Sequence, residues 1–262
     1  MKAPIALLFL VAWAAAAEAG YNRPALQDAF DPNALRIDEG WHLGQTVPDV
    51  SVQTESGQSR LYDLIDGRPT ILILAYYTCH GPCPTTIRNL LEAVRPLEGG
   101  NYRVLVLSFD KNDTLENMRR VVRTVGPVPS SWTFGLLSPE DSQRLTQAVG
   151  FTFFFSERDR AFIHPTVLTF LSPNREVTRY LYGTSPREQD IRLALAESRD
   201  RIGRLNELVD MAALVCYRYD PSRSRYVIHP ALIFGGIGLG VLGVTGIVSF
   251  MYGRSPKGGR KQ

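Results

Sequence analysis

The sequence predicts an α/β protein whose mixed β-sheet carries helices on both faces. Apolar, strand-like runs alternate with segments of helical spacing through most of the chain. Turn residues and helix-capping residues separate these segments, and residues 70–77 form an apolar run suited to a central strand covered on both sides. A chain of 262 residues is long enough to build one large domain or two small ones.

The first half of the chain provides the beginning of the sheet and one clear helix. Alternating residues at 50–52 indicate a strand, and residues 61–65 indicate a short helix or connector between two turns. The apolar run 70–77 follows. A helix is expected from Pro84 to about Pro96, because its apolar residues recur at helical spacing: Ile87, Leu90, Leu91 and Val94.

Strand and helix signals continue to alternate in the second half. Strands are expected at 102–109, 132–137, 162–171 and 176–182, the last two joined by a turn. Helices are expected from a cap at Asp113 or Thr114 through Val125, from Ser138 to near Gly150, and from Pro186 to about Leu214. Pro139, directly after Ser138, suits the first position of its helix.

Both ends of the chain carry membrane-directed patterns. Residues 1–19 have a short basic start, an apolar run and a small-x-small site, which predicts a cleaved secretory signal; an uncleaved anchor is the alternative. Residues 231–252 contain no charge and are long enough to span a bilayer. Because residues 253–262 are basic, we expect this tail to be cytoplasmic. The prediction is a single-pass protein of a bacterial inner membrane, with its soluble domain in the periplasm.

The charge balance argues against a nucleic-acid partner. The chain has 29 basic and 26 acidic residues, a net charge of +3. Four of the basic residues lie in the tail: Arg254, Lys257, Arg260 and Lys261. Without them the remainder carries about −1 (3 − 4), so no polybasic face for nucleic acid is expected.

The motif Cys79-x-x-x-Cys83-Pro84 is the strongest sign of chemistry. It follows the buried strand and enters the next helix, so both sulfurs are expected near a helix N-terminus, where thiolates are stabilised. Thiolates at this spacing can form a disulfide or bind a soft metal ion together. Three cysteines in all are too few for a disulfide-stapled scaffold, which leaves a structural bridge as the weakest of the three interpretations.

From about Leu43 to Ala196, the chain resembles the Sco/SenC family of the thioredoxin-like superfamily. The resemblance is carried by these pieces: Pro48-Asp49, the strand before the cysteine motif, Ser108-Phe109-Asp110 with Asp113-Thr114, Phe162-Ile163-His164, Leu171-Ser172-Pro173 and Arg179 to Gly183. It implies a thioredoxin-like domain, placed at 41–200. A polar arm at 20–40 would precede the domain, and a closing helix and linker at 201–230 would follow it.

The resemblance also implies a function and a site. Proteins of that family bind copper through the two motif cysteines and a distant histidine, and they help to assemble the binuclear copper centre of cytochrome c oxidase or reduce its cysteines. By this resemblance Cys79, Cys83 and His164 are the copper ligands, and the oxidase subunit bearing that centre is the partner. The leading prediction is therefore a membrane-tethered copper chaperone.

A thiol–disulfide oxidoreductase is the alternative, with Cys79 attacking a client disulfide and Cys83 resolving the intermediate. It is favoured by the segment 165–170, which looks like the thioredoxin segment whose cis-proline faces the active cysteines. The chain also departs from many members of the family in two ways. Many of them have Ser or Thr directly after the histidine, where this chain has Pro165. Many are anchored at the N-terminus, whereas the anchor predicted for this chain is C-terminal. A redox or copper sensor is a weaker third reading.

Other candidate residues have simpler interpretations. His80 is expected to be a solvated cap residue, with pKa tuning or a spare ligand as alternatives, and Cys216 a buried inert thiol, with a copper donor or mixed-disulfide partner as alternatives. Asp113 is expected to cap a helix and Asp110 to close a strand. The aromatic run 151–155 is expected to pack in the core and at an edge, or to form a docking surface if exposed. No chemistry is assigned to the two remaining histidines, His42 and His229.

Overall fold

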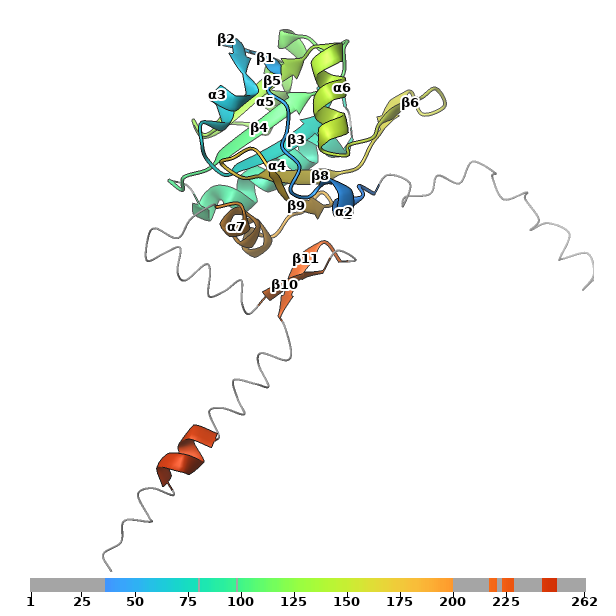
Figure 1. Cartoon of the computed structure of the whole chain (residues 1–262). Helices are drawn as coiled ribbons and strands as arrows, with labels where there is room; N and C mark the ends of the chain where they lie inside the picture. Colours follow the sequence, from blue (N-terminus) through green and yellow to red (C-terminus); the bar gives the residue numbers. More distant parts are fainter. Residues whose placement is uncertain are drawn as a thin grey trace, which may run out of the picture. The chain divides into compact units, whose positions relative to one another are not determined.

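A seven-stranded mixed sheet forms the centre of the structure, a computed structural model that describes residues 36–79, 81–97, 99–199, 217–220, 223–228 and 242–248 (Figure 1). The order of its strands is β2-β1-β5-β4-β3-β8-β9. Their bounds are β1 Ser51–Thr54, β2 Gly57–Arg60, β3 Thr70–Ala75, β4 Arg103–Ser108, β5 Trp132–Leu137, β8 Val167–Leu171 and β9 Val177–Tyr182. The expected mixed α/β sheet flanked by helices is confirmed.

The middle of the sheet is parallel and its margins are antiparallel. β3 pairs in parallel with β4, and β4 with β5, whereas β8 runs antiparallel to β3 and β1 runs antiparallel to β5. All six residues of β3 are buried, as are all five of β8. These strands are apolar throughout because both of their faces are covered.

Short and long helices connect the strands. Their bounds are α2 Glu39–His42, α3 Leu61–Ile65, α4 Pro82–Val94, a 3-10 turn at Arg95–Leu97, α5 Leu115–Val125, α6 Pro139–Ala148 and α7 Glu188–Glu197. α4 packs against α5 and α7, whereas α6 packs against β5. α6 begins as expected, because the Ser138 hydroxyl accepts a hydrogen bond from the Asp141 amide and Pro139 occupies the first turn.

The strand expected at 162–171 is divided. Its first part, β7 (Ala161–Ile163), pairs with β6 (Phe154–Ser156) in a separate two-stranded hairpin, and its second part is β8. Between them, residues 164–166 belong to no strand. Proline has no N–H to donate to a strand ladder, which is why the strand is interrupted at Pro165.

The described part of the expected closing helix is α7, which ends at Glu197, where the Ser198 hydroxyl bonds the Ala194 carbonyl and the Thr178 hydroxyl. The rest of that prediction, residues 200–214, lies outside the described residues. A hairpin that the sequence analysis did not predict follows, formed by β10 (Tyr217–Asp220) and β11 (Arg225–Ile228). It is joined to the sheet because the Tyr219 hydroxyl donates to the Tyr180 carbonyl over 2.5 Å.

Several predicted segments lie outside the described residues: the signal 1–19, the arm up to residue 35, the tail 253–262, and the residues His80, Cys216 and His229. Of the predicted span 231–252, residues 242–248 are described and helical. Within the described ranges, no helix combines the length and the apolar character needed to cross a bilayer.

Candidate metal centre

The two motif cysteines lie where the central strand passes into a helix. Cys79 is in the loop that follows β3, and its amide donates to the Tyr76 carbonyl. Cys83 is in the first turn of α4, which begins at Pro82, two residues before the expected start. A proline suits this position because the first N–H groups of a helix have no intrahelical partner. Both thiols are free and their residues are buried, at 6% and 7% exposure.

The thiols share one proton unequally. A hydrogen bond from Cys83 lowers the pKa of Cys79 to about 5, and backbone amides lower it further while burial opposes them. One of these amides is that of Gly81, 3.4 Å from the Cys79 Sγ. The same hydrogen bond, together with burial, raises the pKa of Cys83. The pair therefore holds a thiolate at Cys79 and a thiol at Cys83 near neutral pH.

His164 lies in the loop between β7 and β8 and reaches the sulfur pair. Its Nε2 is 3.6 Å from the Cys83 Sγ. Its Nδ1 is 2.9 Å from the Pro165 carbonyl. A carbonyl only accepts, so Nδ1 carries the proton and the lone pair of Nε2 faces Cys83. Burial lowers the pKa of His164, which keeps the ring neutral and able to bind a metal.

The spacing of sulfur and nitrogen suits two ligands of one metal ion. First-row metal bonds of about 2.3 Å to sulfur and about 2.0 Å to nitrogen, set about 120° apart, place the two atoms about 3.7 Å from each other. The separation between Cys83 Sγ and His164 Nε2 matches this value. In the described part of the chain, however, no three His, Cys, Asp or Glu side chains are already assembled for a metal. Cys83 and His164 are already spaced as two ligands of one ion, and the Cys79 Sγ would have to move toward them to complete a site with three ligands.

Aromatic rings surround the histidine, and the sequence analysis did not assign them to the site. The ring centroids of Tyr76, Phe109 and Phe151 lie 5.8, 5.5 and 5.6 Å from that of His164. Phe162 contacts both Tyr76 and Phe109. The aromatic run at 151–155 was the available signal: Phe151 is buried as expected, whereas Phe154 and Phe155 are exposed.

Asp113 positions the cysteine loop instead of capping a helix, so the cap prediction for it was wrong. Thr114 is the N-cap of α5, and its hydroxyl accepts from the Asn117 amide. The buried Asp113 carboxylate accepts from the Tyr77 amide over 2.6 Å and from the Ser108 hydroxyl over 2.5 Å. Because the Tyr77 amide would otherwise be buried without a partner, the aspartate turns inward.

Asp110 lies just beyond β4, as expected. Its Oδ1 accepts from the backbone and side-chain nitrogens of Asn112. No cis peptide bond occurs among the described residues, so Pro165 differs in this respect from the cis-proline of the thioredoxin segment that residues 165–170 resemble. The Pro165 carbonyl accepts a hydrogen bond from the Nδ1–H of His164.

Comparisons with known proteins agree with the fold. Two solved structures overlap most of their own length with this chain. One is a protein from Aquifex aeolicus VF5 proposed to act in electron transfer: it is 30% identical, with a TM-score of 0.56, and the match covers 60% of this chain and 94% of that one. The other is a SCO1/SenC family lipoprotein from Bacillus anthracis str. Ames, 19% identical, with a TM-score of 0.51 and coverages of 57% and 92%.

A further solved structure, ScoI of Arabidopsis thaliana, was determined with copper bound. It is 20% identical over 55% of this chain and 90% of that one, with a TM-score of 0.46. No match was found among curated proteins. The family model described as SCO1/SenC matches residues 44–197, which include the cysteine motif, His164 and the whole seven-stranded sheet. The chain therefore belongs to the SCO1/SenC family.

Proposed function

We propose that the protein carries one copper ion on Cys79, Cys83 and His164 and delivers it to the copper centre of a respiratory cytochrome c oxidase. The observation that carries the proposal is the 3.6 Å approach of the His164 Nε2 to the Cys83 Sγ, with Nδ1 held by the Pro165 carbonyl. Two sulfurs and an imidazole suit copper(I), which is a soft ion. Membership in the SCO1/SenC family supports copper as the cargo and a cytochrome c oxidase as the client.

The site suits transfer of an ion more than permanent storage. The Cys79 thiolate can bind copper without first losing a proton, whereas Cys83 must release one when it binds. A client thiolate can then replace the protein's ligands one at a time. In this proposal the domain lies in the periplasm, held to the inner membrane by the segment 231–252, and the oxidase subunit meets it there.

Metal stoichiometry of the full-length chain tests the proposal. Purified under reductant and exposed to copper(I), the protein should bind one equivalent. Cys79→Ala should abolish binding, and His164→Ala should weaken it by about tenfold or more, measured by competition with a chelator. His42→Ala is the matched control, because the His42 ring bonds the Ala148 carbonyl and is not one of the proposed copper ligands. Unchanged stoichiometry in Cys79→Ala would rule out the proposed site.

A thiol–disulfide reductase remains the second candidate, because a thiolate beside a thiol is also the arrangement needed to attack a disulfide. The trans Pro165 removes one feature that favoured it. The two candidates differ in their need for His164. Reduction of a client disulfide by the metal-free protein, at the same rate in His164→Ala, would establish the reductase and leave copper without a role.

A further inference from the structure

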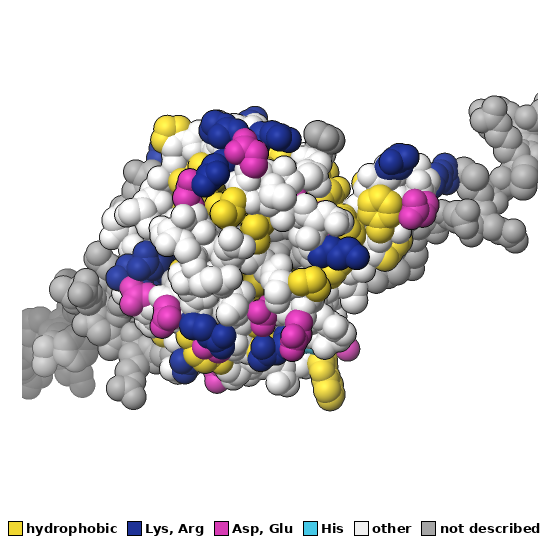
Figure 2. Space-filling view, turned by 90° about the horizontal axis from the view of Figure 1, so that it is seen from above, with side chains coloured by type: hydrophobic (Ala, Val, Ile, Leu, Met, Phe, Trp, Pro, Cys, Tyr) yellow, Lys and Arg dark blue, Asp and Glu magenta, His cyan; other side chains and the backbone are white. Residues whose placement is uncertain are grey.

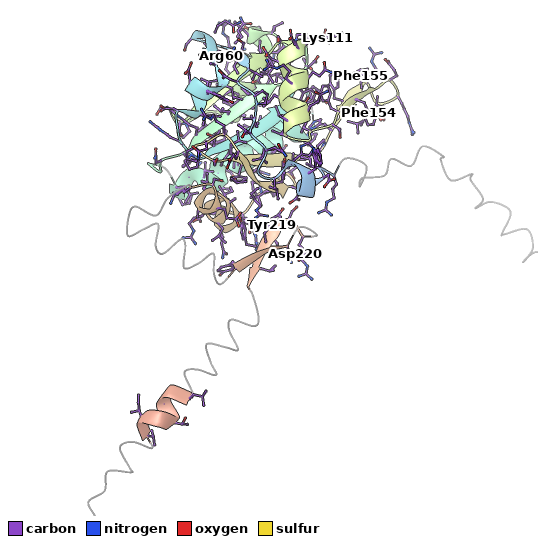
Figure 3. The ribbon with its side chains drawn as sticks, in the orientation of Figure 1. Arg60, Lys111, Phe154, Phe155, Tyr219 and Asp220 are labelled. Atoms are coloured by element: carbon purple, nitrogen blue, oxygen red, sulfur yellow. The ribbon has the colours of Figure 1, made fainter. Side chains whose placement is uncertain are left out.

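An open cavity of about 470 Å³ lies beside the proposed copper site, and neither the copper chemistry nor the reductase chemistry uses it. One wall is aromatic and is formed by Phe109, Phe151, Phe153 and Phe162. Much of the remaining lining comes from α6, which contributes Pro139, Ser142, Gln143, Thr146 and Gln147. Lys111 and Asp110 lie at the end of the cavity near the start of α6, and Figure 3 labels Lys111 there.

The cavity and the copper site share a wall. Phe109 and Phe151 line the cavity, and the same two rings contact the imidazole of His164. An occupant of the cavity would therefore be separated from the metal-binding histidine by a single layer of rings.

The shape of the cavity fits an extended polypeptide. Its lining follows α6 from Pro139 to Gln147, eight residue steps, or about 12 Å at the rise of an α-helix. An extended chain covers that length with about four residues. A groove of this length with an apolar wall accommodates a short peptide stretch bearing a large apolar side chain.

The hairpin beside the cavity offers a strand edge for such a segment. β6 pairs with β7 on one side only, and the two strands form a sheet of their own. Figures 1 and 2 show this hairpin standing out from the body beside α6, with apolar and charged side chains on its surface. Phe154 and Phe155, labelled in Figure 3, are 51% and 45% exposed. An unpaired edge of this kind can accept an additional strand.

The charge of Lys111 at one end of the cavity indicates which second residue a docked segment would carry. Lys111 is exposed and forms no ion pair within the described part of the chain, and it is the sole lysine there. The Asp110 carboxylate, which lines the same end of the cavity, is hydrogen-bonded by Asn112, and no ion pair between it and Lys111 occurs in the described part of the chain. The exposed ammonium group of Lys111 can therefore pair with an acidic residue of a partner at this end of the groove.

We propose that the groove between α6 and the β6–β7 hairpin docks an extended segment of the client protein, with a large apolar side chain against the four phenylalanines and an acidic residue facing Lys111. The inference rests on the proposed function for the identity of the client, the copper-bearing oxidase subunit. Docking there would bring that subunit's own metal ligands to His164 and the two cysteines. The groove would thus select the client before any metal bond is exchanged.

Peptide binding to the full-length, copper-free, reduced chain tests the docking. The probes are overlapping fluorescein-labelled peptides that together cover the copper-bearing domain of the same organism's oxidase subunit. A peptide containing a large apolar and an acidic residue should bind. Gln143→Trp, which fills the groove from an exposed position of α6, should weaken its binding about tenfold or more. Gln58→Trp, the same change on the exposed β2, is the matched control and should leave binding unchanged.

Lys111→Glu provides a second variant at an exposed position. It should also weaken binding, whereas Arg192→Glu, an exposed charge reversal on α7, should not. Absence of binding by every peptide, or equal affinity in the parent and Gln143→Trp, would overturn the docking proposal. Reduced self-association of Gln143→Trp with unchanged peptide binding would assign the groove to a second copy instead.

Copper transfer distinguishes failure of this inference from failure of the proposed function. Peptide binding that depends on Gln143 and Lys111, without any copper transfer to the intact domain, would retain the docking surface and reject the chaperone. Transfer at equal rates from the parent and Gln143→Trp would retain the chaperone and reject the docking surface.

Discussion

At the scale of single residues, the two cysteines of one motif have different chemistry. Cys79 accepts hydrogen bonds from the Cys83 thiol and from the Gly81 amide, so its negative charge is compensated. Cys83 lies beside the neutral imidazole of His164 and keeps its proton. One residue is thus ready to bind a metal ion or attack a disulfide, and the other must first be deprotonated.

This asymmetry predicts a low-pH titration. In the reduced protein, the alkylation rate of Cys79 by iodoacetamide should stay high as pH falls and drop only near pH 5, because the folded pKa lies below the ordinary value of about 8.5. Mass spectrometry of the modified residue reports the rate. Cys83→Ala removes the largest cause of the shift, so its midpoint should move upward. A midpoint near 8.5 in the parent protein would contradict the shared proton.

Asp113 is the second residue whose role depends on burial. Asp113→Ala leaves the Tyr77 amide and the Ser108 hydroxyl without their partner, which should lower the free energy of unfolding by about 2–4 kcal/mol. Urea denaturation measures the change. Asp63→Ala, at an exposed position of α3, should stay within about 0.5 kcal/mol of the parent. Equal losses in the two variants would show that Asp113 has no special role.

At the scale of elements, Tyr77 and Gly135 hold the central strands together beneath the site. The Tyr77 hydroxyl donates toward the carbonyls of Val106 and Gly135 and accepts from the Gly135 amide. Gly135 leaves no room for a side chain, because a Cβ there would overlap the Val52 Cγ1. The Tyr77 hydroxyl therefore joins β4 to β5, and Val52 of β1 packs against Gly135 of β5.

Gly135→Ala should disturb this junction. The added methyl group must displace Val52 in a packed core, so we expect a loss of about 1–3 kcal/mol in the free energy of unfolding. Thermal unfolding followed by circular dichroism checks it. Gly40→Ala in α2 is the matched control: its Cβ would have no neighbour closer than 3.4 Å, and the change should be neutral or slightly stabilising. A neutral Gly135→Ala would mean that β1 can shift away.

The sequence predicted the central elements well, because their signals are local. β3, β4, β5 and the start of α6 could be recognised from apolar runs and from the Ser138–Pro139 cap. The β6–β7 and β10–β11 hairpins were missed. β6 and β7 have three residues each, too few for a periodic pattern, although they pair locally across residues 157–160. The approach of His164 to Cys83, 81 positions apart, was expected only from the family resemblance.

At the scale of the whole molecule, the folded unit continues beyond the closing helix. Tyr219 and Tyr226 of the β10–β11 hairpin are buried. The buried Asp190 of α7 accepts from the Tyr226 amide over 2.9 Å and pairs with Arg187 over 2.7 Å. The hairpin thus contacts both β9 and α7.

Truncation tests this extension of the domain. A protein that ends at Arg199 loses both buried tyrosines and the Tyr226 amide that donates to Asp190, so it should be less stable than one that ends at residue 230 by about 3 kcal/mol or more. The midpoint of thermal unfolding, measured on both proteins after removal of residues 1–35, gives the comparison. Identical midpoints would place the end of the domain at residue 200.

The separation of the ligands along the chain has a thermodynamic consequence. The sulfurs follow β3, and the imidazole follows a hairpin 81 positions later, so the donors come together only after the sheet has formed. An unfolded chain would offer a cargo ion the two thiols and the neighbouring His80, but not the imidazole of His164. Tighter binding of the ion by all three ligands of the folded protein therefore stabilises the native state by mass action. This stabilisation is lost when the ion passes to a client.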